Sequence, residues 1–151
     1  MRLIHWRILL VVWMAAIYLV SSELFVTRFS GDATEEVFGL LNFGIRKLAH
    51  MTEFGVLVFL WFRSIEAPGG QFGSRLITSM LFTLGYAITD EIHQSYVPER
   101  LGVWTDVLWD AAGILAAGYL LRRVSRTGSE DLRRRVLGAD TEPNGGAPEE
   151  G

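Results

Sequence analysis

The chain contains no cysteine at all. This absence excludes a disulfide framework, a thiolate metal site and a cysteine nucleophile. A phosphate-binding loop is missing too, since no Lys followed by Ser or Thr comes after Gly69, Gly70 and Gly73. No polar segment shows the interleaved basic and aromatic residues of a nucleic-acid surface. Nucleic acid is therefore not expected as a partner.

Long apolar stretches dominate what the chain does contain, and half of its 151 residues are hydrophobic. Four stretches approach the ~20 residues that cross a bilayer as a helix. They run from about Ile8 to Val26, Gly44 to Phe62, Leu76 to Val97 and Val103 to Leu121. Backbone groups inside hydrocarbon must be hydrogen-bonded internally, which favours helices. The predicted fold class is all-α, an integral membrane four-helix bundle.

The predicted domain boundary follows the last apolar stretch. Residues 1–127 are expected to form the transmembrane domain, and residues 128–151 a cytoplasmic, largely disordered tail with an amphipathic turn at Leu132 to Leu137. The Arg133-Arg134-Arg135 run is expected to lie on anionic lipid headgroups. The first stretch resembles a signal peptide up to Val20, but no small-x-small cleavage site follows it.

The basic residues predict the orientation, because they concentrate in cytoplasmic flanks. With the N-terminus inside, four basic residues face outward, namely Arg28, Arg46, Lys47 and Arg100. Ten face the cytoplasm: Arg2, Arg7, Arg63, Arg75, Arg122, Arg123, Arg126, Arg133, Arg134 and Arg135. The protein is therefore expected to be a multi-pass membrane protein, with both termini cytoplasmic.

Ionisable side chains interrupt three of the four stretches, although each charge in a membrane helix costs a few kcal/mol. Helical spacing gathers them into three stripes. The stripes are Arg46, His50, Glu53 and Leu57; Asp90, His93, Gln94 and Val97 flanked by Glu91; and Asp106, Asp110, Gly113 and Ala117. In the predicted orientation all three lie toward the outer face. We therefore expect one shared polar pocket, with Arg100 closing its mouth.

Four roles for this pocket stay open. His50 and Glu53, with Asp90 and His93, could supply two divalent-metal ligands per helix, completed by Asp106 or Asp110. A metal-free acid–base pair, an ion-paired network that fixes helix packing, and a pocket for a lipid headgroup or peptidoglycan precursor are the others. The catalytic candidates are His50, Glu53, Asp90, Glu91 and His93. The ligand-binding candidates are Gln94, Arg100, Asp106 and Asp110.

Three motifs resemble the VanZ-like family over roughly Lys47 to Gly118. They are His50-Met-Thr-Glu53-Phe-Gly-Val-Leu, Thr89-Asp90-Glu91-Ile-His93-Gln94-Ser-Tyr-Val-Pro-Glu-Arg100 and Thr105-Asp106-Val-Leu-Trp-Asp110-Ala-Ala-Gly113. Glu99 departs from the family pattern, in which a small residue precedes the arginine, and it adds a carboxylate at the mouth.

This resemblance implies a cell-envelope protein of the bacterial plasma membrane, of the kind associated with low-level resistance to teicoplanin-type lipoglycopeptides. The implied partners are membrane lipids and a lipid-linked wall precursor. The family has no assigned reaction, so a membrane-embedded enzyme acting on an envelope lipid, and a small transporter or proton-coupled subunit, stay as alternatives. The sequence does not fix the oligomeric state.

Overall fold

The fold is described from a computed structural model, which places residues 3–21, 37–66, 71–96 and 105–138. This part of the chain is helical throughout, without strands. The helices are α1 (Leu3–Ser21), α3 (Val37–Ser64), α4 (Phe72–Ser95), α5 (Thr105–Thr127) and α6 (Glu130–Leu137). The predicted all-α class is confirmed.

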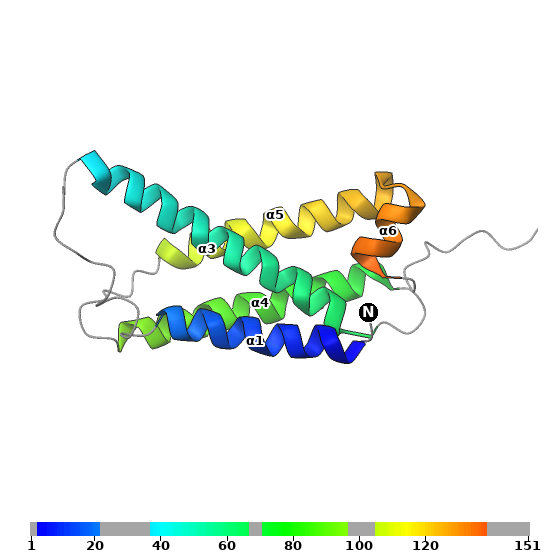
Figure 1. The fold of residues 1–151 in the computed structure, drawn as a ribbon, viewed down its shortest axis with the longest axis horizontal. Helices are drawn as coiled ribbons and strands as arrows, with labels where there is room; N and C mark the ends of the chain where they lie inside the picture. The colour runs from blue at the N-terminus through cyan, green and yellow to red at the C-terminus, as the bar shows by residue number, and fades with distance from the viewer. Residues whose placement is uncertain (1–2, 22–36, 67–70, 97–104, 139–151) are drawn as a thin grey trace, which may run out of the picture.

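Four long helices alternate in direction along the bundle (Figure 1). The end of α1, the start of α3, the end of α4 and the start of α5 lie at one end, which is the left in the figure. The short helix α6 turns back at the opposite end, where α1 begins and α3 ends. Loops therefore connect neighbouring ends, and residues near the left end come from four different helices.

Helix α3 is the central element, since it packs against α1, α4 and α5, most extensively against α5. Its fully buried residues are Phe54, Leu57, Val58 and Phe62. Their spacing of three or four residues makes one helical stripe. Lys47 and His50 continue this stripe toward the start of α3, so the face that forms the apolar core also enters the polar end of the bundle.

The outer surface of the bundle is unusually apolar. Large hydrophobic side chains are exposed along α1, α4 and α5, among them Val12, Leu81 and Leu115, each about 60% accessible (58%, 61% and 63%). Among the described helices, α1 alone is both long and apolar enough to cross a membrane by length and composition. Helices α3, α4 and α5 are longer, but they carry the charged residues discussed below. Membrane crossing by these three helices stays a prediction.

The end of α3 is held by arginines from other helices. Arg7 of α1 donates from Nε to the carbonyl oxygen of Ser64 (3.4 Å), and buried Arg75 of α4 donates to that of Phe62. The last carbonyls of a helix have no intrahelical partner and carry its negative dipole end. Cationic donors therefore satisfy the exposed end of α3 and tie α1 and α4 to it.

Helix α6 packs on this same end. Leu137 is fully buried, and Arg63 of α3 donates from Nη1 to the carbonyl oxygen of Val136 (3.3 Å). Ser129 caps the helix by accepting from the Leu132 backbone N–H. The amphipathic turn predicted at Leu132 to Leu137 is thus part of a helix docked on the bundle, within the segment predicted as tail. The rest of that segment, residues 139–151, lies outside the described residues.

Two helices extend beyond the predicted apolar stretches. Helix α3 begins at Val37 rather than Gly44, and α5 continues to Thr127 rather than ending near Leu121. Hydropathy marks only the apolar part of a helix, whereas the backbone continues as a helix through Arg122, Arg123 and Arg126.

Gly113 sets the closest approach of α3 and α5. A Cβ atom at this position would lie 2.1 Å from the carbonyl oxygen of Met51. A Cβ atom added at Gly55 of α3 would lie 3.5 Å from the carbonyl oxygen of Gly113, an ordinary van der Waals contact. Small residues allow helix backbones to approach in this way.

We expect Gly113→Ala to destabilise the bundle by roughly 1–3 kcal/mol, because the added methyl group meets backbone rather than a movable side chain. The matched control is Gly85→Ala in α4, where nothing lies within 4 Å of the new methyl group. That control should be neutral or slightly stabilising, since alanine favours helix. Thermal unfolding midpoints of the purified variants in mild detergent measure both. Equal midpoints for the two variants would contradict the close approach.

Candidate functional site: a buried polar cluster at one end of the bundle

Asp90 is the centre of a hydrogen-bonded group that joins α1 to α4. Its Oδ2 atom accepts from Nε2 of Gln94 (2.6 Å) and from Oγ of Ser21 (3.1 Å), and Gln94 also reaches the Ser21 hydroxyl (3.4 Å). All three side chains are buried. The other oxygen of Asp90, Oδ1, is buried and has no hydrogen-bond partner among the described residues.

Two side-chain contacts join α3 to α5 at the same end. Lys47 Nζ contacts Asp106 Oδ1, and one turn deeper His50 Nδ1 lies 3.2 Å from Asp110 Oδ1. The side chain of Asp110 is 3% accessible, whereas those of Lys47, His50 and Asp106 are 13–15% accessible. Lys47 and His50 are three residues apart on α3, and Asp106 and Asp110 are four apart on α5. The two contacts therefore lie about one helical turn from each other.

Glu91 links the two groups. It is buried next to Asp90 on α4, and it interacts electrostatically with Asp90, Asp106, Asp110 and His50. Its Oε1 atom is buried without a hydrogen-bond partner in the described part of the chain. Side chains of α1, α3, α4 and α5 therefore converge, with four carboxyl groups in one region. We call Ser21, Lys47, His50, Asp90, Glu91, Gln94, Asp106 and Asp110 the polar cluster.

His93 lies at the edge of this cluster and faces α1. Its ring stacks on that of Tyr18, with ring centroids 4.4 Å apart and planes inclined by 30°. The Nε2 atom is buried and has no partner within the described residues. Although His93 shares a helix face with Asp90, its ring contacts Tyr18 of α1.

The structure brings six of the residues singled out in the sequence into one region. His50, Asp90, Glu91, Gln94, Asp106 and Asp110 belong to the polar cluster. Glu53 is partly buried one turn below His50, and its backbone carbonyl accepts from Trp13 Nε1 (3.1 Å). Arg100 and Glu99 lie outside the described residues, as does the side chain of Arg46.

The residues proposed as metal ligands do not assemble into a metal site in the described structure. Within residues 3–21, 37–66, 71–96 and 105–138, no three His, Asp or Glu side chains are grouped to hold a metal ion. His50 contacts Asp110, and Asp90 accepts hydrogen bonds from Gln94 and Ser21. Within each proposed ligand pair, His50–Glu53 and Asp90–His93, the two residues therefore have different partners.

The contribution of α1 was missed in the sequence. Ser21 and Tyr18 are three residues apart and therefore share a face of α1, where they contact Asp90 and His93. A hydroxyl at the predicted outer end of the first apolar stretch was the available signal. Serine and tyrosine are common at helix ends, however, and only the packing of α1 on α4 gives these two a partner.

The cluster is chemically suited to accept hydrogen bonds. Four carboxyl groups face one lysine and one histidine, and two buried carboxyl oxygens have no donor among the described residues. A buried carboxylate without a donor is costly, so a ligand carrying N–H, O–H or ammonium groups would be favoured there. A bare phosphate would be repelled.

Exchanging the charges of Lys47 and Asp106 tests whether α3 and α5 meet as described. Lys47→Asp adds a fifth carboxylate to the cluster and Asp106→Lys removes the partner of Lys47, so each should lower the unfolding midpoint. The double exchange should recover part of the loss, with a coupling energy of about 0.5–3 kcal/mol. The control is the same exchange at the exposed pair Arg135–Asp131, which should have little effect. Strictly additive losses at Lys47 and Asp106 would mean that the two side chains do not pair.

The chain matches a protein-family model over most of its length. No curated protein and no solved structure matches the chain. The VanZ/LLP1 family model matches residues 5–126, which includes the four long helices almost completely and every residue of the polar cluster. The match covers well over half of the 151 residues. The chain therefore belongs to the VanZ/LLP1 family.

Proposed function

We propose that the chain is an integral membrane protein of the bacterial cell envelope whose polar cluster binds the headgroup of an envelope lipid or a lipid-linked wall precursor. Helices α1, α3, α4 and α5 cross the membrane as a four-helix bundle, and the polar cluster opens toward the outer face. Both termini lie in the cytoplasm.

The observation that carries this proposal is the reversed distribution of polar and apolar side chains. Asp90, Glu91 and Asp110 are at least 95% buried, while large hydrophobic residues cover the outside of α1, α4 and α5. Water would favour the opposite arrangement. A bilayer favours this one, because its hydrocarbon accepts the apolar exterior and charged residues face the bundle interior.

Basic residues support the orientation. Arg7 at the start of α1, Arg63 at the end of α3, Arg75 at the start of α4 and Arg122 at the end of α5 all belong to the end that carries α6 (Figure 1). Basic flanks are characteristic of the cytoplasmic side. The polar cluster, at the opposite end, is then directed toward the outer leaflet, where lipid-linked wall precursors are presented.

The ligand chemistry follows from the orphaned oxygens of Asp90 and Glu91. Sugar hydroxyls, peptide N–H groups and primary amines donate to carboxylates, and wall precursors carry all three. A protein that holds such a precursor would compete with lipoglycopeptides for it. We therefore propose a role in resistance to teicoplanin-type antibiotics, in line with what the family resemblance implies.

Glu91→Gln tests the proposal in cells, because it keeps the shape of the side chain and replaces a carboxylate by a group that also donates. Expressed in a susceptible bacterium, the wild-type protein should raise the inhibitory concentration of teicoplanin. Glu91→Gln should return it toward the empty-vector value at equal membrane abundance and equal unfolding midpoint. The control is Glu66→Gln, an exposed position after α3 at the other end of the bundle.

Three results would count against the proposal. No protection by the wild-type protein would remove the resistance role, and full protection by Glu91→Gln would remove the pocket. A lower midpoint or abundance for Glu91→Gln would show instead that Glu91 belongs to a network that serves only helix packing.

A second function is favoured by the His50–Asp110 contact beside Glu91. An imidazole oriented by a buried carboxylate and next to another carboxyl group is suited to acid–base chemistry on an envelope lipid. Mass spectrometry of membrane lipids after expression separates the two, since an enzyme yields a modified lipid that disappears in Glu91→Gln, whereas a binding protein leaves lipid composition unchanged.

A further inference from the structure

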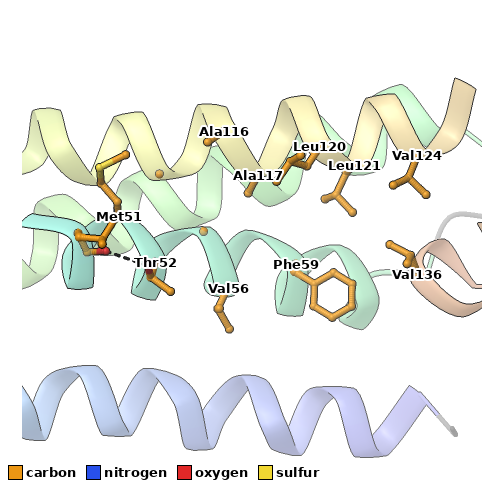
Figure 2. Close-up of a pocket in the computed structure, with 13 residues that line it drawn as sticks. Met51, Thr52, Val56, Phe59, Ala116, Ala117, Leu120, Leu121, Val124 and Val136 are labelled. Carbon is orange, nitrogen blue, oxygen red and sulfur yellow. Dashed lines mark hydrogen bonds between the residues drawn. The ribbon is translucent and has the colours of Figure 1, made fainter. Parts of the chain in front are cut away.

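An apolar groove of about 480 Å³ runs between α3 and α5 and ends at α6. Its floor is made by small residues, including Gly55, Gly113, Ala116 and Ala117. Figure 2 shows Val124 of α5 and Val136 of α6 directed toward each other at one end of the groove, with Phe59 of α3 nearby. The groove contains no carboxylate and lies apart from the polar cluster.

The length of the groove matches one leaflet of a bilayer. Its lining extends from Leu48 to Phe59 on α3 and from Gly113 to Val124 on α5. Eleven helical steps at 1.5 Å span about 16 Å, close to half of the ~30 Å hydrocarbon thickness. The groove occupies the half of α5 that leads to α6, which is the cytoplasmic half in the proposed orientation.

Arginines lie at the α6 end of the groove. Arg123 is exposed and lies three residues after Leu120, a lining residue of α5. Arg133 lies three residues before Val136, so it shares the α6 face that closes the groove. Arg7, Arg63 and Arg75 at this end donate to backbone carbonyls.

Arg133 differs from those three arginines. Its stem packs at Gly128, where an added Cβ would lie 3.3 Å from Arg133 Cγ, and its Nε atom is buried without a hydrogen-bond partner among the described residues. A buried guanidinium donor without an acceptor is costly. A phosphate oxygen is an acceptor whose geometry suits it.

We propose that this groove binds an anionic phospholipid of the cytoplasmic leaflet, with one acyl chain between α3 and α5 and the phosphate on Arg133 and Arg123. The small side chains along the groove leave room for a hydrocarbon chain. The positive charge of the arginines complements the negative charge of the headgroup. The inference rests on the proposed membrane placement, but not on any ligand of the polar cluster.

A second copy of the chain is the competing occupant, and charge argues against it. Two copies in one membrane have the same orientation, so pairing through the groove would bring both sets of arginines together. Like charges placed opposite each other disfavour such an interface. A lipid phosphate removes this repulsion instead of adding to it.

Native mass spectrometry of the full chain, released from bilayers of equal phosphatidylglycerol and phosphatidylethanolamine, tests the proposal. The wild-type monomer should retain phosphatidylglycerol in preference to phosphatidylethanolamine. Arg133→Gln should reduce this retention roughly fivefold, the effect of about 1 kcal/mol for one basic residue. Its control is Arg135→Gln, which alters an exposed arginine of the same helix that is paired with Asp131.

The groove itself is tested by filling it. Ala116→Trp should abolish lipid retention, whereas Leu115→Trp, at an exposed neighbouring position outside the lining, should not. If Ala116→Trp lowers the unfolding midpoint, the smaller Ala116→Leu decides in its place. Carbonate-resistant membrane sedimentation checks the membrane placement separately, so its failure would be distinguished from failure of the groove.

Several outcomes would overturn the proposal. They are equal retention of the two lipids, equal losses in Arg133→Gln and Arg135→Gln, lipid still retained when Ala116 is enlarged, or a dimer without bound lipid that Ala116→Trp dissociates.

Discussion

Burying carboxylates beneath an apolar surface is the constraint on which the arrangement of this bundle depends. Asp90, Glu91 and Asp110 cannot be left alone in such surroundings, because an isolated buried charge costs far more than a helix contact returns. Asp90 accepts from Ser21 of α1, Asp110 contacts His50 of α3, and Gln94 donates to Asp90 from one turn further along α4 itself. Each pairing between two helices fixes the axial position and the rotation of one helix relative to the other. The cluster therefore specifies the register of the four helices, in a way that an apolar core alone would not.

The two ends of the bundle carry opposite chemistry. One end gathers carboxyl groups inside the bundle, and the other places arginines on helix ends and on α6. Arg7 and Arg75 donate to the last carbonyls of α3, and Arg63 donates to α6, so these charges also hold the helices together. Between the ends, the close approach at Gly113 brings α3 and α5 together and leaves the small-residue groove beside it. The polar cluster and the groove are thus separate features on the two sides of one helix crossing.

Much of this arrangement could be predicted from the sequence, because helical spacing and the cost of buried charge are both local properties. The stripes through His50, Asp90 and Asp110 followed directly from them. Partner choice could not be predicted. His93 shares a face with Asp90, yet it stacks on Tyr18, and Lys47 pairs with Asp106, because these contacts depend on helix rotation and on the packing of α1. The docking of Leu137 was also beyond reach, since eight residues of α6 carry too short a pattern to show what they pack against.

The most direct test is whether the apolar exterior of α4 and α5 contacts lipid. Nitroxide labels at Val12, Leu81 and Leu115 sample exposed positions of α1, α4 and α5, and the absence of native cysteine makes the labelling specific. Power-saturation spectroscopy in proteoliposomes compares collisions with oxygen, which enters the bilayer, and with a water-soluble nickel chelate. High oxygen and low nickel accessibility are expected at all three positions, and the reverse at Asp131, an exposed residue of α6. Nickel accessibility at Leu81 and Leu115 equal to that at Asp131 would contradict this lipid contact, even if Val12 were protected.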